Sequence, residues 1–234
     1  AVVSVSALVR GPVKPAIALI AHPRLNMRGR LGFSTEDIAG TQATRLQIDL
    51  PLLKNLKADD VSVSAASNIE GLSVKSVLWG KGIDNGRVSL KYNNESITAS
   101  GEAVYAETPI SFKWMEDLSN GRSIKRRIEA GLTAKTRLAK IFDLHYPEIL
   151  DGPVPLKLVY EQRQNNDAEL SARLDLQDAK FYVPGFDWAK LPGRPGTARL
   201  SASFRDGSIT TINGFNIQSG AFSAVGNVAF EPRD

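Results

Sequence analysis

The chain has 234 residues, of which 42% are hydrophobic and 23% charged, a composition typical of a folded domain rather than a disordered segment. Its formal net charge of +4 is too small for a dedicated nucleic-acid surface, so no nucleic-acid partner is expected. There is no cysteine, which excludes disulfides, thiolate metal sites and cysteine nucleophiles. No apolar run approaches the roughly 20 residues that a membrane-spanning helix requires.

Few helices are expected along the chain. Residues 15–21 predict one or two helical turns, with Pro15 at the first helical position, where a missing N–H costs little. Residues 51–56 predict another turn. Residues 133–144 carry apolar side chains at helical spacing and predict the one longer helix, capped by Thr133.

Alternation with a period of two residues dominates the rest of the sequence, and this period is typical of β-strands with one apolar face. Such runs occur throughout the chain. The residues that share a face within each run are Val88, Leu90 and Tyr92; Ile110, Phe112 and Trp114; Val154, Leu156, Leu158 and Tyr160; Leu170, Ala172, Leu174 and Leu176; and Ala198, Leu200, Ala202 and Phe204.

Turn-forming residues separate these runs and predict tight hairpins, because Asn-Gly and Asp-Gly accept positive φ angles. The predicted turns are Asp84-Asn85-Gly86, Asn93-Asn94, Ser119-Asn120-Gly121, Asp151-Gly152, Asn165-Asn166-Asp167, Asp206-Gly207 and Asn213-Gly214. Residues 184–196 are rich in proline and glycine and predict a long loop, with Trp188 holding it to the sheet through its indole ring.

A weak internal repeat is visible. Each copy has a strand, a polar turn and a strand that begins with Ser-Ile-Thr, at Ser96 and at Ser208. Repetition of a hairpin unit indicates a sheet that grows along one axis. We therefore predict an all-β fold with a few short helices, in which one elongated, strongly twisted and mostly antiparallel sheet curls into a groove. Residues 1–120 and 121–234 are the expected sub-units.

Several stretches resemble the AsmA-like superfamily, and within it the YhdP-type proteins. They are LVRGPVKPAIALIAHPRL near the start, GRVSLKYNNESITASGEAVYAETPISFKWMEDL in the middle, and LDGPVPLKLVYEQRQ with LDLQDAKFYVPGFDWAKLPGRPGTARLSASFRDGS in the third part. The run that ends in Lys-Leu-Pro-Gly is the most distinctive. These are strand and turn patterns, so they specify architecture better than function.

The resemblance implies that the chain is a fragment of a larger periplasmic protein of a Gram-negative envelope, anchored in the inner membrane through parts outside the fragment. It also implies an apolar β-groove that moves phospholipids between the inner and outer membranes. AsmA-like proteins are similar in this respect to the bridge-like lipid transporters. The expected partners are therefore phospholipid acyl chains and, through other parts of the parent protein, membranes.

The residues that usually carry chemistry are sparse. The two histidines, His22 and His145, have no metal-ligand partner at helical spacing, and no nucleophile-elbow pattern occurs. Adjacent carboxylates such as Glu116 and Asp117 are expected to be solvated turn residues. A basic cluster, Arg122 with residues 125–127, is interpreted as the polar face of a strand, with Arg126 on its apolar side. We expect no enzyme activity, no cofactor and no metal.

The sequence therefore predicts a lipid-binding conduit module. Two alternatives stay open: a structural or protein-interaction domain of the envelope with a closed core, and a β-rich hydrolase. Periodicity cannot separate a closed core from an open lipid-binding surface. The predicted lining is Val88, Leu90, Tyr92, Ile110, Phe112, Trp114, Leu170, Leu174, Leu176, Leu200 and Phe204.

Overall fold

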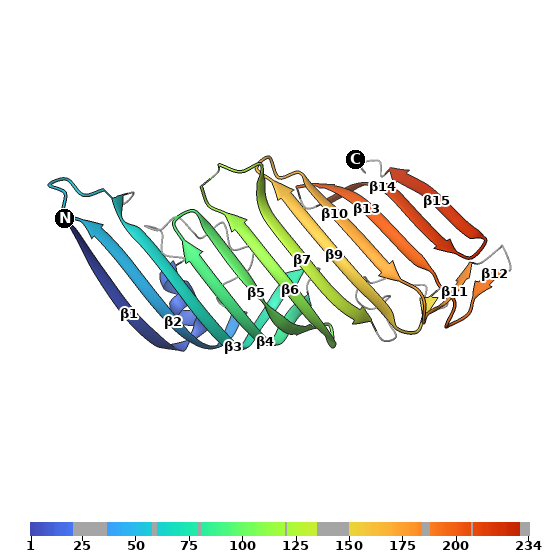
Figure 1. The fold of residues 1–234 in the computed structure, drawn as a ribbon, viewed down its shortest axis with the longest axis horizontal. Coiled ribbons are helices and arrows are strands. Elements are labelled where there is room, and N and C mark those ends of the chain that lie inside the picture. The colour runs from blue at the N-terminus through green and yellow to red at the C-terminus, as the bar shows by residue number, and fades with distance from the viewer. Residues whose placement is uncertain are drawn as a thin grey trace. The chain divides into compact units, whose positions relative to one another are not determined.

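The computed structural model describes residues 1–20, 37–57, 60–78, 81–119, 121–134, 150–183, 188–206 and 208–229. These residues form mostly antiparallel β-structure (Figure 1). The largest sheet has 12 strands in the order β1-β2-β3-β4-β5-β6-β7-β9-β10-β13-β14-β15. It has two edge strands, so it is not closed into a barrel. The predicted all-β class, with a mostly antiparallel sheet and few helices, is confirmed.

Almost every strand of this sheet pairs with its neighbour in sequence, which is the meander that the hairpin pattern predicts. The strands are β1 (Val2–Pro12), β2 (Ile38–Pro51), β3 (Ser62–Leu78), β4 (Lys81–Asn93), β5 (Ser96–Tyr105), β6 (Thr108–Asp117), β7 (Ile124–Ala134), β9 (Val154–Arg163), β10 (Ala168–Asp175), β13 (Thr197–Arg205), β14 (Ser208–Ser219) and β15 (Phe222–Ala229).

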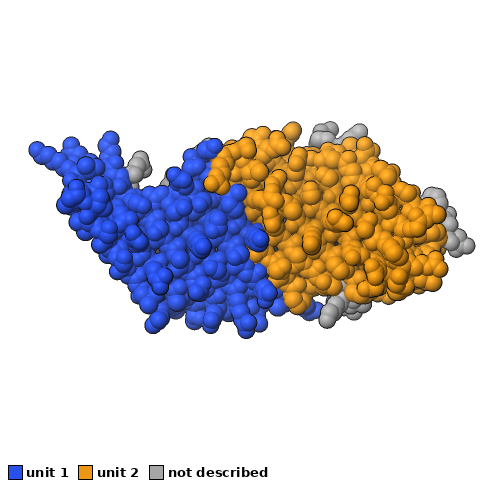
Figure 2. All heavy atoms as spheres, in the orientation of Figure 1, with its two compact units in different colours: residues 1–107, 113–121 blue, residues 108–112, 122–234 orange. Residues whose placement is uncertain are grey.

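The chain divides into two compact units, coloured in Figure 2. Unit 1 comprises residues 1–107 and 113–121, and unit 2 comprises residues 108–112 and 122–234. The division falls within β6 and after it, close to the boundary expected at residue 120. Each unit is described separately below.

Unit 2 also contains a sheet of three short strands, in the order β12-β11-β8. They are β8 (Leu150–Asp151), β11 (Lys180–Val183) and β12 (Trp188–Lys190). The prediction of one long loop over residues 184–196 is therefore wrong at its centre, because Trp188 to Lys190 pair with β11. The pattern missed β12 because three residues are too few to show alternation.

Two predicted turns are instead irregularities inside long strands. Asn85 has a φ of 51° and lies within β4, where the pairing with β5 shifts between Asp84 and Arg87. Asn213 and Gly214 lie within β14, where the pairing with β13 also shifts. A β-bulge inserts an extra residue and often uses the same residue types as a tight turn, so composition alone does not separate the two.

The helix predictions had mixed outcomes. Helix α1 (Val13–Ile20) matches the predicted turns near residue 15, although it begins two residues earlier than expected. Pro51 ends β2, and residues 52–56 form a non-helical turn after it in place of the predicted helical turn. Thr133 lies in β7 opposite Pro155 and cannot cap a helix there; the rest of the predicted helix, from residue 135, lies outside the described residues. No helix in the described ranges is long and apolar enough to cross a bilayer.

Gly101 is required by the close approach of β4 and β5. A Cβ atom at this position would lie 2.1 Å from the carbonyl oxygen of Arg87. We predict that Gly101→Ala lowers the free energy of unfolding by about 1–3 kcal/mol, because the two strands must move apart. Urea unfolding followed by circular dichroism measures this change.

Gly214→Ala is the matched control, because nothing lies within 4 Å of a Cβ built there. Its effect should stay within about 1 kcal/mol, since the alanine restricts the unfolded chain and meets no atom in the folded one. Equal losses in the two variants would show that close packing at Gly101 does not limit stability.

Candidate functional site

Unit 1 carries an apolar face that crosses five strands, because directly paired residues lie on the same side of a sheet. One row runs from Ile69 on β3 through Val88 on β4 to Gly101 on β5, and another, two rows away, from Ala65 through Tyr92 to Ile97. The row through Ala65 continues to Leu46 on β2 and Ala7 on β1. The opposite face of the same strands is polar and carries Arg45, Asn68, Glu70, Arg87, Ser89, Lys91, Ser100 and Glu102.

Much of this apolar face is buried. Val88 and Ile69 are each 6% exposed, and Ile97 is 3% exposed. Leu90, Tyr92 and Trp114 pack against a small core made by Ile97 and Leu118. Burial raises the pKa of Tyr92. Towards β1 the face becomes exposed, since Val3, Val5 and Val9 all have large exposed fractions.

Polar side chains interrupt the apolar face of unit 1 at one place. Gln42 and Thr44 on β2 lie on this face, as does Ser67 on β3. The Thr44 hydroxyl is hydrogen-bonded to the Ser67 hydroxyl (2.8 Å) and to the Gln42 side-chain oxygen. Gln42 and Ser67 are both buried, so their hydrogen bonds to Thr44 offset the cost of removing them from water.

Unit 2 carries a second apolar face, built by the same rule. A central row joins Ala130 on β7, Leu158 on β9, Ala172 on β10, Leu200 on β13 and Phe215 on β14. The parallel rows on either side of it contain Leu132, Leu156, Leu174, Ala198 and Ile217, and Ile128, Tyr160, Leu170, Ala202 and Ile212.

Burial is incomplete along this face, and each of its three rows has one buried member: Leu156, Ala172 and Ala202. Leu156 is 2% exposed, whereas Leu158 and Tyr160, further along β9, are only half-buried. Leu170, Leu200 and Phe215 are also half-buried, although each lies on a strand with neighbours on both sides. An apolar side chain in the middle of a sheet keeps such exposure where no described residue packs fully over it.

The buried end is closed by the three-stranded sheet and the turn before it. Val154, Leu176 and Ala179 form a core there, and Leu174, Ala198 and Ile217 of the large sheet pack against it. The Trp188 ring stacks on Phe222 with centroids 4.0 Å apart, and Phe181 meets both rings edge-on. The expectation that Trp188 holds this segment to the sheet is confirmed by that stacking.

Lys190 fixes this closure through its ammonium group. The residue is 1% exposed, and Nζ donates to the carbonyl oxygens of Gln177 (2.9 Å), Ala179 (2.8 Å) and Leu191 (3.1 Å). Burial lowers the pKa of Lys190, and the carboxylates of Asp178 and Asp175 oppose that shift. Three acceptors match the three N–H groups of the charged amine, so the protonated form suits this site.

The other end of the unit 2 face is polar at its margin. Arg126 lies on the apolar side of β7 opposite Gln162, as the sequence predicts. Burial raises the pKa of Tyr160, and the nearby Arg126 charge opposes this shift. Tyr160 meets Phe204 edge-on, with centroids 6.4 Å apart.

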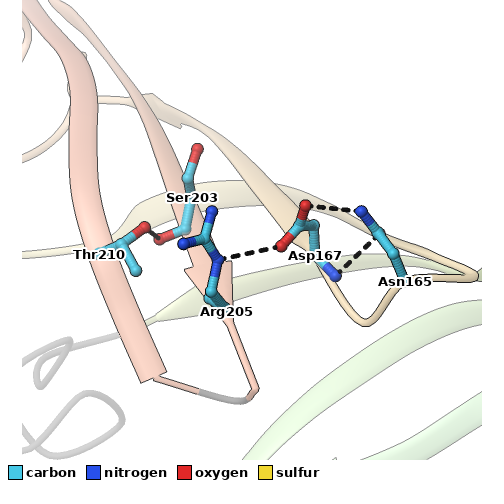
Figure 3. Close-up of polar contacts among 5 residues, drawn as sticks. All are labelled: Asn165, Asp167, Ser203, Arg205 and Thr210. Carbon is cyan, nitrogen blue, oxygen red and sulfur yellow. Dashed lines mark hydrogen bonds and ion pairs between the residues drawn. The ribbon is translucent and has the colours of Figure 1, made fainter.

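Hydrogen bonds stiffen the turns at this end. In Figure 3, Asp167 lies between Asn165 and Arg205; it accepts from the Asn165 amide nitrogen (2.8 Å) and from Nε of Arg205 (3.4 Å). Thr210 donates to the backbone carbonyl oxygen of Ser203 (3.1 Å). These contacts join the β9–β10 turn to the β13–β14 hairpin.

The predicted lining residues fall into three groups. Val88, Leu90 and Tyr92 lie on the apolar face of unit 1, with Trp114 packed beside them, and Leu170, Leu174, Leu200 and Phe204 lie on that of unit 2. Ile110 and Phe112 are half-buried and alternate with exposed residues along β6.

Leu176 differs from the rest. It follows the end of β10, is 2% exposed, and donates its backbone N–H to the carbonyl of Gly196 (2.8 Å). It belongs to the closed core and not to the strand face on which the alternation placed it. Conversely, the predicted lining did not include Leu158, Phe215 and Ile217, which also lie on the unit 2 apolar face. The alternation in the sequence around Phe215 and Ile217 could have indicated the last two.

The carboxylates Glu116 and Asp117 are not solvated turn residues, and that prediction is wrong. They end β6 and are 0% and 3% exposed, and the Ser119 hydroxyl donates to Asp117 (2.8 Å). In the basic cluster, Arg127 points to the polar face and forms ion pairs with Glu129 and Glu161, as expected for a strand's polar side. His22 and His145 lie outside the described residues.

Within the described ranges, no group of three or more histidine and carboxylate side chains is placed to hold a metal ion. Comparisons with protein-family models, with curated proteins and with solved structures gave no match to this chain. The apolar face in each unit is therefore the candidate functional surface of this chain.

The contacts of Lys190 predict a large loss of stability when its amine is removed. Lys190→Met keeps the apolar stem but leaves three carbonyl groups without their donor, so the free energy of unfolding should fall by about 3 kcal/mol or more. Lys180→Met, at an exposed position on β11, should change it by less than about 0.5 kcal/mol. Chemical denaturation measures both, and equal small effects would contradict the role of Lys190.

Proposed function

We propose that this chain is a lipid-binding module whose apolar sheet faces hold phospholipid acyl chains, without turnover chemistry. The observation that carries the proposal is the incomplete burial of the unit 2 face. Leu158, Leu200 and Phe215, at the centre of the sheet, are only half-buried. A closed core packs against the neighbouring row of Leu174, Ala198 and Ile217. Acyl chains offer no hydrogen-bonding groups, so a continuous apolar surface is sufficient to hold them.

The polar margin of the same face supports this proposal. Arg126 lies at the end opposite the closing sheet, beside Tyr160. An amphiphile needs an apolar surface for its chains and a polar surrounding for its headgroup. A face that passes from a closed apolar end to a margin bearing an arginine provides both.

The resemblance to the AsmA-like superfamily extends the proposal. It rests on strand and turn patterns such as the Lys-Leu-Pro-Gly run, whose lysine is the buried Lys190. On that basis we propose that the parent protein is periplasmic, anchored in the inner membrane, and moves phospholipids between the two membranes of a Gram-negative envelope.

A closed structural or protein-interaction domain is the second candidate. Its support comes from unit 1, where Ile69, Val88 and Ile97 are all buried. If the same closure extended to unit 2, the apolar faces would be cores and not binding surfaces. The two candidates therefore differ in what a polar substitution at the centre of the unit 2 face does.

Site-specific photo-crosslinking in cells tests the proposal directly. A photoreactive residue at Leu200, or at Leu90 in unit 1, should capture phospholipid, because these side chains lie on apolar faces. The neighbouring positions Ser201 and Ser89 lie on the opposite faces and are the matched controls. Lipid adducts are identified by mass spectrometry of the purified protein.

Leu200→Asp separates the two candidates. On a lipid-binding face, a carboxylate should abolish adduct formation at the neighbouring Leu170 while the protein stays folded, because acyl chains cannot lie against an ion without desolvating it. In a closed core, the same substitution should unfold unit 2. The absence of adducts at every position of a folded protein would contradict the lipid-binding proposal.

A further inference from the structure

The polar face of unit 2 carries a row of three cations. Lys157 on β9, Arg173 on β10 and Arg199 on β13 are direct cross-strand partners, because Arg173 pairs with both of the others. All three side chains are exposed. Adjacent strands lie about 4.8 Å apart, so the row spans about 10 Å across the sheet.

Folding does not explain this arrangement. Like charges placed directly opposite each other on neighbouring strands destabilise a sheet. None of the three cations forms an ion pair with another residue that the structure describes. The row therefore carries a repulsion that no ion pair among the described residues offsets.

The carboxylates on the same face are already engaged. Glu129 and Glu161 pair with Arg127, and Glu169 lies 3.9 Å from Arg163. Asp175 accepts a hydrogen bond from the backbone N–H of Gln177 (2.9 Å). Asp175 keeps its charge beside the row, whereas the other three acids pair with Arg127 or Arg163, so the row keeps a net positive charge.

The side chains around the row are suited to phosphate groups rather than to a protein partner. Ser171 and Ser201 flank it on one side and Thr197 on the other, and hydroxyls donate to phosphate oxygens as arginine and lysine do. The polar face of β7, β9, β10 and β13 presents no aromatic residue, whereas protein interfaces depend on aromatic anchors in their centre.

We propose that the Lys157–Arg173–Arg199 row docks unit 2 against an anionic phospholipid surface, through the phosphates of its headgroups. The row is exposed, and its residues lie on the face opposite to the apolar one. The contact is electrostatic and peripheral, and it does not depend on acyl chains entering the apolar face. It therefore stands or falls separately from the proposed function.

Vesicle co-sedimentation tests this proposal. The full chain should bind vesicles that contain phosphatidylglycerol more strongly than vesicles of phosphatidylcholine alone, and added sodium chloride should weaken that binding. Replacing Lys157, Arg173 and Arg199 together with glutamine should lower the partition coefficient on the order of 100-fold, since each basic side chain near an anionic surface contributes about fivefold.

The matched control removes the same charge from unit 1. Arg45, Arg87 and Lys91 are exposed cations on its polar face, and their replacement with glutamine should leave most of the vesicle binding intact. The variant of the row should unfold at the same temperature as the wild type or higher, because a repulsion has been removed. That result rules out misfolding as the cause of lost binding.

Three outcomes would overturn the proposal. The first is equal loss of binding in the two triple variants, which would mean that net charge alone governs the contact. The second is equal binding to both kinds of vesicle. The third is wild-type protein that ignores phosphatidylglycerol vesicles but binds soluble inorganic polyphosphate, which would assign the row to a soluble polyanion.

Discussion

The cross-strand register is the constraint on which the rest of this structure depends. Because side chains alternate along a strand and directly paired residues share a face, one register places the leucines of β9, β10 and β13 in common rows. The same register places Lys157, Arg173 and Arg199 together on the other face. A shift by one residue would exchange the two sets, so the apolar face and the basic row are two results of one pairing scheme.

Much of the fold follows from local pattern in the sequence. The period of two predicts β4, β6, β9, β10 and β13, and the polar dipeptides at Asn93 and Asn165 predict their turns. The Asn-Gly pairs at Asn85 and Asn213 mislead because a bulge and a hairpin both favour residues that tolerate positive φ. Only the partner strand decides between them, and the partner is not part of the local sequence.

The sequence predicts which residues share the apolar faces, but it does not predict how deeply each of them is buried. Alternation identifies which residues share a face, and it places Leu90, Leu170 and Leu200 correctly. It cannot show that Leu176 is closed over while Leu170 stays half-exposed, because that difference depends on a three-stranded sheet assembled from distant segments. The burial of Glu116 and Asp117 was missed for the same reason, since a carboxylate near a turn is normally solvated.

The burial of Lys190 also has a chemical consequence. An amine that is 1% exposed and donates to three carbonyl oxygens cannot react with an acylating reagent until those bonds break. Exposed lysines such as Lys157 and Lys180 have no such protection. The rate at which Lys190 becomes acylated therefore measures how often β12 separates from the turn at residues 177–179.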